Sequence, residues 1–174
     1  MNKALRTAAL AAASLATLCF SGAASAAWTF TDDTGGASIS GAYPSFTITG
    51  SNLFDLEDDL AVYSQTFASA QAVTFTWSYV TDDCCGSAWD PAGYVLNGVQ
   101  HQLSINGPAG QGSSGAATID VDSGDVFGWY VESLDSSQGP GILSVSVVPE
   151  PANVALMLAG LGALAFAARR RARD

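Results

Sequence analysis

The sequence predicts an all-β protein whose main domain, residues 27–147, is an antiparallel β-sandwich. Apolar and hydroxyl residues alternate without a fault from Val73 to Tyr79, and a period of two places successive side chains on opposite faces of a strand. Turn residues separate short runs of this kind. Asn97-Gly98 is the strongest turn, because both residues accept the positive φ of a type I′ hairpin. A segment of this length holds one compact core and no more.

The expected strands follow these patterns along the chain. They span residues 28–31, 46–49, 61–67, 73–79, 99–105, 117–121, 126–134 and 142–148. In the run 73–79, the Val, Phe, Trp and Tyr side chains are expected to face the core and the Thr and Ser side chains the outside. Only residues 53–60 hint at a helical turn. The acidic residues there lack the glycine and spacing of an EF-hand loop and are expected to form a solvated turn: Asp55, Glu57, Asp58 and Asp59.

Residues 1–26 have the three parts of a secretory signal peptide. Lys3 and Arg6 form a positively charged start, residues 8–20 an apolar core, and Ala24-Ser25-Ala26 a small-residue cleavage site. We therefore expect the chain to pass through the export machinery and to lose this segment to signal peptidase.

The C-terminus predicts a single transmembrane helix. Residues 152–168 form an apolar run of 17 residues. At about 1.5 Å per residue this gives about 25 Å of helix, enough for a thin bilayer. A basic cluster follows the run: Arg169, Arg170, Arg171 and Arg173. By the positive-inside rule these arginines are topogenic and hold that end in the cytoplasm, which places residues 27–147 outside.

The order of elements in residues 148–174 resembles the PEP-CTERM sorting signal of exported bacterial proteins. Its motif is the short polar segment Val148, Pro149, Glu150 and Pro151, which precedes the apolar run and the arginines. The resemblance implies processing by an exosortase through an inner-membrane intermediate, then a place at the surface of a Gram-negative cell or in the medium. The same tail is also labelled "ice-binding protein C-terminal", which says nothing about ice binding. The alternative is a plain anchor that is never processed.

The charge distribution narrows the classes of partner. All six Lys and Arg residues lie in the two terminal segments, whereas 14 of the 16 acidic residues lie in residues 27–147. No Lys or Arg salt bridge can form within the domain. Nucleic-acid binding is excluded, because phosphate contacts need cationic side chains. Anionic membranes and acidic polymers are poor partners unless a metal bridges them.

A second resemblance covers residues 37–147. The run from Phe75 to Gly98 and the run from Ser123 to Asp135 are similar to a jelly-roll module of bacterial secreted proteins. The resemblance implies a sandwich laid out like the CUB-type domains, some of which hold calcium at one end, and it implies no defined activity. Cys84-Cys85 departs from the module, which usually has small or acidic loop residues at that place.

A calcium site is one interpretation of the loop aspartates. Asp82, Asp83 and Asp90 lie on one expected loop, and Asp135 follows a strand that could pass beside it. Calcium takes six to eight oxygen ligands, which these carboxylates and nearby carbonyls could supply. Clustered carboxylates in a domain without cations repel one another unless metal or water separates them. The alternative is a set of solvated Asx-turn aspartates.

Cys84 and Cys85 are the cysteines that remain after signal-peptide removal, in a compartment where disulfides persist. A vicinal disulfide between them would stiffen the loop beside Asp82 and Asp83. Intermolecular bridging and free thiols are the alternatives. Metal binding by the pair together with His101 is the fourth and least favoured.

Catalysis finds little support, and we expect a protein that is not an enzyme. His101 lies on the apolar side of an alternating strand, which is typical of a half-buried structural histidine, and no Gly-x-Ser-x-Gly elbow accompanies it. Glu57 and Glu132 are present as carboxylates, but nothing in their spacing indicates a glycosidase pair.

Three Thr-x-Thr segments raise the question of ice binding. They are Thr29 to Thr31, Thr47 to Thr49 and Thr74 to Thr76. They could order water only if the three strands lay side by side. Threonine on the outer face of a sandwich is otherwise ordinary.

Two functions remain. One is an exported cell-surface or extracellular-matrix protein that acts through its presence in a polymer layer. The alternative is a calcium-assisted carbohydrate-binding or adhesion module for extracellular polysaccharide, with Trp89 and Tyr94 as aromatic platforms beside the acidic loop.

Overall fold

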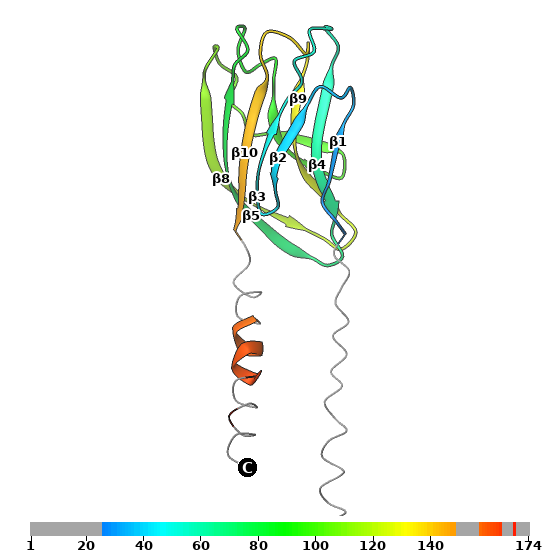
Figure 1. Cartoon of the computed structure of the whole chain (residues 1–174), viewed down its shortest axis with the longest axis vertical. Helices are drawn as coiled ribbons and strands as arrows, with labels where there is room; N and C mark the ends of the chain where they lie inside the picture. The colour runs from blue at the N-terminus through cyan, green and yellow to red at the C-terminus, as the bar shows by residue number, and fades with distance from the viewer. Residues whose placement is uncertain (1–25, 149–156, 165–168, 170–174) are drawn as a thin grey trace, which may run out of the picture.

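The computed structural model describes residues 26–148, 157–164 and 169. Over these residues the chain forms strands in two five-stranded sheets, and every pairing is antiparallel. The strands are β1 (Thr29–Asp32), β2 (Ser38–Ala42), β3 (Ser45–Thr49), β4 (Asp59–Thr66), β5 (Gln71–Thr81), β6 (Ala92–Leu96), β7 (Val99–Gln102), β8 (Gly112–Val121), β9 (Val126–Ser133) and β10 (Gly141–Val148). This confirms the all-β antiparallel sandwich expected from the sequence (Figure 1).

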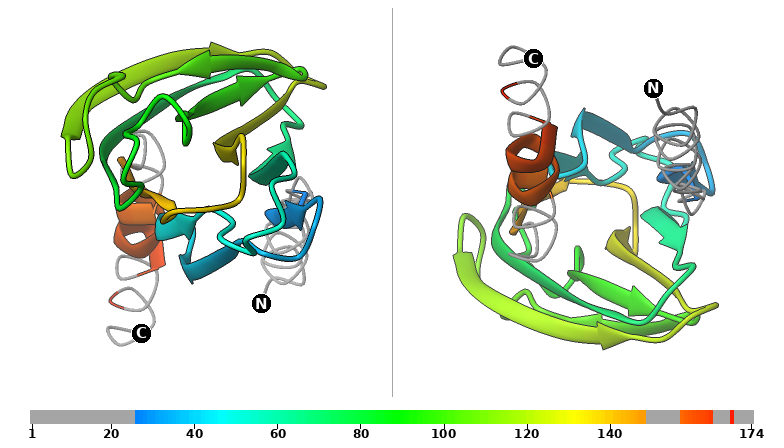
Figure 2. Two further views of the ribbon diagram at one scale, coloured as in Figure 1. Left: turned by 90° about the horizontal axis from the view of Figure 1, so that it is seen from above. Right: turned by 90° about the horizontal axis from the view of Figure 1, so that it is seen from below.

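The two sheets have the orders β1-β4-β9-β6-β7 and β2-β3-β10-β5-β8, which we call the first and the second sheet. Figure 2 views the domain along its strands and shows the two layers. The core residues belong to strands of both sheets. The inner and outer faces of β5 are those that the alternation predicts. Val73, Phe75 and Tyr79 are buried, whereas Thr76 and Ser78 are exposed on the outer face.

Aromatic rings fill the middle of the core. Trp129 of β9, in the first sheet, is fully buried and contacts rings of the second sheet, with centroids 5.2 Å from Phe46 and 5.3 Å from Phe75. Trp28 stacks on Trp129 at 5.2 Å and so joins the start of β1 to the core. Large aromatic side chains bury much area each, and edge-to-face pairs of this kind add to that burial.

The hairpin between β6 and β7 turns where the sequence predicts it. Asn97 and Gly98 both have positive φ, 52° and 81°. The Asn97 side chain donates to Asp125 Oδ1 at 2.8 Å and accepts the Val126 amide at 2.9 Å. The hairpin is therefore fastened to the turn before β9.

Two local expectations are wrong. Residues 53–60 contain no helix; Phe54 and Leu56 have positive φ, and β4 begins at Asp59. His101 is exposed and not half-buried, because β7 is the edge strand of the first sheet and all four of its residues are exposed.

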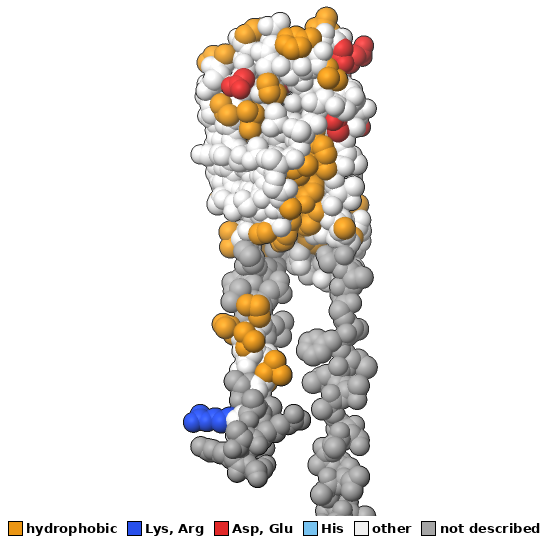
Figure 3. Space-filling view, viewed as in Figure 1, with side chains coloured by type: hydrophobic (Ala, Val, Ile, Leu, Met, Phe, Trp, Pro, Cys, Tyr) orange, Lys and Arg blue, Asp and Glu red, His pale blue; other side chains and the backbone are white. Residues whose placement is uncertain are grey.

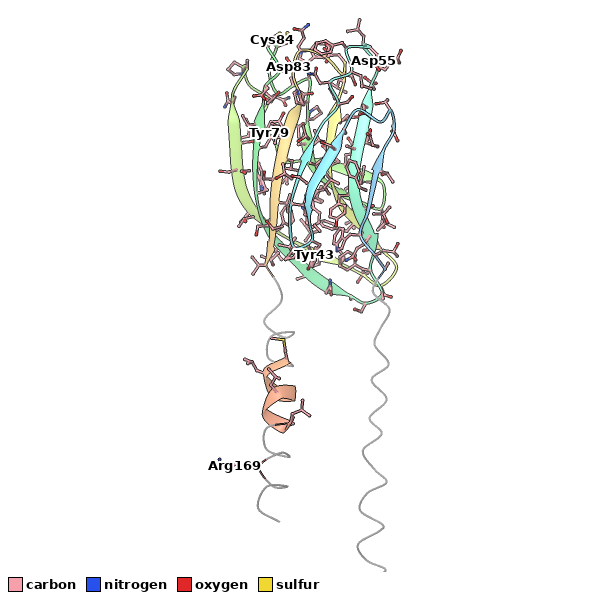
Figure 4. All side chains as sticks on the ribbon, in the orientation of Figure 1. Tyr43, Asp55, Tyr79, Asp83, Cys84 and Arg169 are labelled. Atoms are coloured by element: carbon pink, nitrogen blue, oxygen red, sulfur yellow. The ribbon has the colours of Figure 1, made fainter. Side chains whose placement is uncertain are left out.

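β1 begins and β10 ends at the same end of the sandwich (Figure 1). The labelled Asp55, Asp83 and Cys84 lie at the opposite end, and Tyr43 lies near the termini (Figure 4). We call the end that carries Asp83 the loop end. A group held there lies at the opposite end of the sandwich from the end of β10.

The terminal segments fall largely outside the described residues. These include residues 1–25 of the expected signal peptide, Pro149, Glu150 and Pro151, and Arg170, Arg171 and Arg173. Within the expected transmembrane run, residues 157–164 are helical and exposed, and Arg169 is also helical. In the part of the chain that the structure describes, no helix has both the length and the apolar character needed to span a membrane.

Candidate functional site

A row of polar side chains closes the core at the loop end. Asp59 of β4 is the partner of Ser133 of β9, and Asp90 lies just before β6 on the other side of Ser133. The hydrogen bonds from the amide of Glu132 to the carbonyl of Pro91, 2.9 Å, and from Leu134 to Trp89, 2.8 Å, extend the β6–β9 pairing to Asp90. All three polar residues are buried, Asp59 being 2% exposed and the other two 0%.

The next row inward is apolar, which shows that the polar row faces the interior. It consists of Ala61, Val131 and Ala92, which pair across the same three strands and are fully buried. Because side chains two residues apart on a strand share a face, the polar row lies directly above this apolar one.

Thr81, the last residue of β5, connects the second sheet to this row. Its hydroxyl donates to Asp90 Oδ2 at 2.8 Å and accepts the amide of Asp83 at 3.0 Å. The Tyr79 hydroxyl donates to the carbonyl oxygen of Asp90 at 2.6 Å. Gly141 is required beside them, since a Cβ there would lie 2.8 Å from the Cβ of Asp90.

Asp83 is buried by the turn that follows it. Its Oδ1 accepts the amides of Cys85 and of Gly86, the latter at 3.1 Å, which is an Asx-type arrangement. Gly86 has a φ of 99°, and a Cβ there would meet the carbonyl oxygen of Gly107 at 2.0 Å. Only glycine lets the β5–β6 loop fold back this closely, and the fold-back leaves Asp83 with 0% exposure.

The remaining oxygens of these carboxylates are buried without a hydrogen-bond partner. They are Asp83 Oδ2, Asp90 Oδ1 and Asp59 Oδ2, together with the hydroxyls of Ser51, Ser133 and Ser136. A buried polar atom without a partner costs about 1 to 3 kcal/mol, and more when it is charged. We call the polar residues whose side-chain oxygens are buried at this end of the core the acidic layer: Asp32, Ser51, Asp59, Thr81, Asp83, Asp90, Ser133 and Ser136.

The pKa of Asp90 is raised to about 6, primarily by burial and further by the charges of Asp83 and Asp135. The hydroxyls of Thr81 and Ser133 oppose this rise. The Ser133 hydroxyl thus lies near enough to Asp90 to lower the pKa of that carboxyl, although its geometry does not complete a hydrogen bond. No Lys or Arg occurs in residues 27–147, so a neutralising charge must be a proton or an ion from solution.

Three of the four aspartates predicted to bind calcium lie at the loop end, but among the described residues their oxygen atoms do not gather within 4.8 Å of one another. Asp83 and Asp135 both act electrostatically on Asp90. Asp135 Oδ1 also accepts the amide of Ser137 at 3.1 Å, which shapes the β9–β10 loop. Asp82 lies on the same loop as Asp83 but is exposed, and its amide donates to the carbonyl of Pro140 at 3.1 Å.

Both cysteines are free thiols on the surface of the loop end. The sulfur atoms of Cys84 and Cys85 lie 3.1 Å apart, and the Cys84 thiol donates to Gln138 Oε1 at 3.5 Å. Asp83 and the two thiols hold their ligand atoms within 4.8 Å of one another. The vicinal disulfide stays a prediction.

The two aromatic candidates occupy different surroundings. Trp89 is 44% exposed on the loop between Asp83 and Asp90. Tyr94 is half-buried; its ring stacks on His101 at 4.6 Å and on Phe127 at 5.9 Å. Trp89 is therefore the free aromatic surface beside the acidic layer.

Sequence reasoning missed Asp59 as a buried group, because the acidic run around it is typical of a solvated turn. A signal was present in the alternation of Asp59, Ala61 and Tyr63, which continues the inner face of β4 by one position. The same extension from Tyr94 and Ala92 reaches Asp90. Asp55, Glu57 and Asp58 are exposed as expected.

The threonine ladder required for ice binding is not formed. Thr29 and Thr31 belong to the first sheet, whereas the other two Thr-x-Thr segments belong to the second, where β10 separates β3 from β5. The outer face of the second sheet carries hydroxyls, with Thr47 and Ser144 at 2.9 Å and Thr74 and Thr118 at 3.0 Å. Figure 3 shows this area as a broad surface with few hydrophobic or charged side chains.

Comparison with known proteins identifies a sorting motif in the tail. The PEP-CTERM protein-sorting motif matches residues 147–171. No curated protein sequence matches the chain.

The domain has solved structures of similar layout. A family 35 carbohydrate-binding module from Clostridium thermocellum is 12% identical, with a TM-score of 0.36, over 67% of this chain and 90% of that one. A family 35 module from Cellvibrio japonicus is 18% identical, with a TM-score of 0.38, over 73% and 90%. A family 61 module in complex with β-1,4-galactotriose is 10% identical, with a TM-score of 0.40, over 71% and 88%. These likenesses concern the backbone alone.

Proposed function

We propose that the chain is an exported, non-enzymatic protein of the cell surface or extracellular matrix, delivered through its C-terminal sorting motif. The observation that carries the proposal is the position of that motif. It matches from residue 147, and β10, the central strand of the second sheet, ends at Val148. Processing after β10 leaves every strand of the sandwich on the released side.

The route follows from the two terminal segments. Residues 1–26 direct the chain into the export machinery and are removed by signal peptidase. Residues 152–168 then hold an inner-membrane intermediate, with Arg169, Arg170, Arg171 and Arg173 on the cytoplasmic side, until an exosortase acts at the motif. The loop end faces away from the membrane during this stage, since it is opposite to the end of β10 (Figures 1 and 4).

Expression of the full chain in a host with and without its exosortase tests this route. The wild type is expected to leave the membrane fraction only when the exosortase is present, with an intact mass that lacks the tail. Pro149→Ala combined with Glu150→Ala should keep the chain in the membrane. Asn153→Ala, which changes a tail residue outside the motif, should be released normally. Release of the double variant would contradict the proposal.

A calcium-assisted carbohydrate-binding module is the second candidate, and the acidic layer favours it. The free oxygens Asp83 Oδ2 and Asp90 Oδ1 are buried, and Asp135 lies within electrostatic reach of Asp90. Hard oxygen donors of this kind suit calcium, whose charge would offset carboxylates that have no Lys or Arg partner. Bound calcium would hold the β5–β6 and β9–β10 loops together.

Trp89 gives this candidate a surface for sugar. Its ring is exposed on the same loop, and its carbonyl accepts the amide of Leu134 at 2.8 Å, which ties it to β9. A fixed aromatic face can stack on the apolar face of a sugar ring. Tyr94 contributes less, because both His101 and Phe127 cover its ring.

A glycan array probed with the full chain separates the two functions. The module predicts binding that EDTA abolishes, calcium restores and Trp89→Ala removes. Phe54→Ala is the matched control, because Phe54 is 69% exposed on the β3–β4 loop. If the calcium-loaded wild type retains no glycan, the carbohydrate-binding function is rejected and the matrix role stands alone.

A further inference from the structure

We propose that Asp32 and Asp59 form a second calcium site, distinct from the Asp83–Asp90 pair, that fastens the β1–β2 loop to the sandwich. The site concerns the opposite margin of the acidic layer, where the edge strand β1 meets β4. It does not depend on carbohydrate binding.

The β1–β2 loop aligns the two carboxylates. Asp32 is the last residue of β1 and pairs with Ala61 of β4. Asp59 precedes Ala61 by two residues and begins β4. The amide of Ala37 donates to Asp32 Oδ2 at 3.0 Å, and the amide of Thr34 donates to Asp59 Oδ1 at 3.1 Å. One oxygen of each carboxylate is thus held by the loop, while Asp32 Oδ1 and Asp59 Oδ2 are buried without partners.

The two carboxyl groups also approach each other closely. Burial raises the pKa of Asp59, and the contact with the Asp32 side chain raises it further, against the lowering effect of Thr34. Two neighbouring carboxylates in a dehydrated place do not both ionise unless a positive charge joins them. The pair must therefore share a proton or hold a cation.

A serine hydroxyl favours the cation. Ser51 is 1% exposed, its hydroxyl has no hydrogen-bond partner, and it lies against the same loop, where a Cβ on Gly36 would approach its Oγ to 2.0 Å. A shared proton would neutralise the carboxylate pair but would leave the hydroxyl without a partner. A cation can be coordinated by the carboxylate and hydroxyl oxygens together.

The donor set selects calcium among the common cations. It consists of oxygen atoms alone, from carboxylates and a hydroxyl, which excludes a preference for softer metals. Magnesium demands near-ideal octahedral geometry and usually keeps several waters, whereas calcium accepts irregular groups of protein oxygens. Held at this place, calcium would fix residues 33–37 over the start of β4.

Counting calcium on the full chain in detergent tests the proposal. After dialysis against calcium, elemental analysis of the wild type should give two ions per chain. Asp32→Asn and the milder Ser51→Ala should lower the content or the affinity at one site, and Asp90→Asn should remove only the other ion. Asp33→Asn is the control, since Asp33 is exposed beside Asp32.

Amide hydrogen exchange locates the ion without any variant. Calcium should slow exchange at Thr34 and Ala37 by about 100-fold when its concentration is 100 times the dissociation constant. The same slowing should persist in Asp90→Asn and disappear in Asp32→Asn.

The outcomes distinguish this site from the one invoked under the proposed function. A single ion that only Asp90→Asn removes, with no change in exchange at Thr34 and Ala37, overturns the second site and leaves the Asp83–Asp90 site intact. A single ion that only Asp32→Asn removes supports the Asp32–Asp59 site and rejects the Asp83–Asp90 site. A wild type without calcium overturns both.

Discussion

The hydroxyl of Thr81 donates to Asp90 at 2.8 Å and so joins the last residue of β5 in the second sheet to a residue two positions before β6 of the first. The same hydroxyl accepts the amide of Asp83. A single side chain therefore positions two buried carboxylates that come from the two ends of one loop.

Thr81→Val should destabilise the fold by about 2 to 3 kcal/mol, because the isosteric change leaves a buried carboxylate oxygen and a backbone amide without their partner. Urea unfolding of the full chain measures the loss. Thr76→Val is the matched control: Thr76 is an exposed residue of the same strand, and its substitution should change stability by no more than about 0.5 kcal/mol. Equal effects of the two substitutions would contradict the role of Thr81.

Without metal, the pKa of Asp90 at about 6 makes stability depend on pH. The folded pKa lies above the ordinary value of 3.8, so protonated Asp90 favours the folded state. This contribution is fully present below that ordinary value and is lost as the pH rises through 6. Asp59, whose pKa burial also raises, adds in the same direction.

The free energy of unfolding in EDTA should therefore contain a component that falls by up to about 1.4 kcal/mol per pH unit over this range. Subtracting the curve of Asp90→Asn isolates the contribution of Asp90. Parallel curves for wild type and variant would show that Asp90 titrates normally in the folded chain.

Calcium binding at Asp83 and Asp90 should weaken in acid, because the ion must then displace a proton from Asp90. The dissociation constant is expected to be about tenfold higher at about pH 5 than above pH 7, given a pKa near 6. Calorimetry in buffers of different ionisation enthalpy should also detect the released proton below pH 6. An affinity that stays constant across this range excludes Asp90 as a ligand.

The alternation of residues predicted the inner strands except β6. In β5, the Val, Phe and Tyr positions are buried because the first sheet covers the inner face of this strand along most of its length. Burial on one face only is what an alternating sequence predicts directly. Among the edge strands it missed β2, and in β7 it predicted a half-buried His101 that is exposed. β2 consists largely of small and hydroxyl residues, and His101 of β7 lies on an inward position that no opposing strand covers.

The acidic layer could be predicted only in part, for a different reason. Asp83, Asp90 and Asp135 were grouped because they are close in the sequence or flank one strand. Asp32 and Asp59 are joined by the pairing of β1 with β4 and by a loop that donates an amide to each. Their burial is a property of tertiary structure, and the local acidic composition around Asp59 indicates the opposite.

The vicinal disulfide is tested on chain exported by the native route. The exposed thiols of Cys84 and Cys85 lie side by side, so oxidation outside the cytoplasm should join them within one chain. Intact mass before and after reduction should then differ by two hydrogens, and Cys84→Ser should abolish the difference. A dimer that dissociates on reduction would show intermolecular bridging instead. Cysteines that are alkylated without prior reduction would show free thiols.

Gly86 should be the least replaceable glycine of the loop end. Both Gly86 and Gly98 have positive φ, 99° and 81°, so alanine at either position pays the same backbone penalty of about 1 to 2 kcal/mol. At Gly98 nothing lies within 4 Å of an added Cβ, whereas at Gly86 the carbonyl oxygen of Gly107 stands 2.0 Å away. Gly86→Ala must therefore also push apart the β5–β6 and β7–β8 loops and expose Asp83.

We expect Gly98→Ala to cost only the backbone penalty in urea unfolding, and Gly86→Ala to cost at least about 1 kcal/mol more, in the range of core overpacking. Gly86→Ala should in addition weaken calcium binding, since its amide holds Asp83 Oδ1 at 3.1 Å. Equal destabilisation by the two variants would mean that the close approach at Gly107 relaxes freely. Asp83 would then owe its position to Thr81 alone.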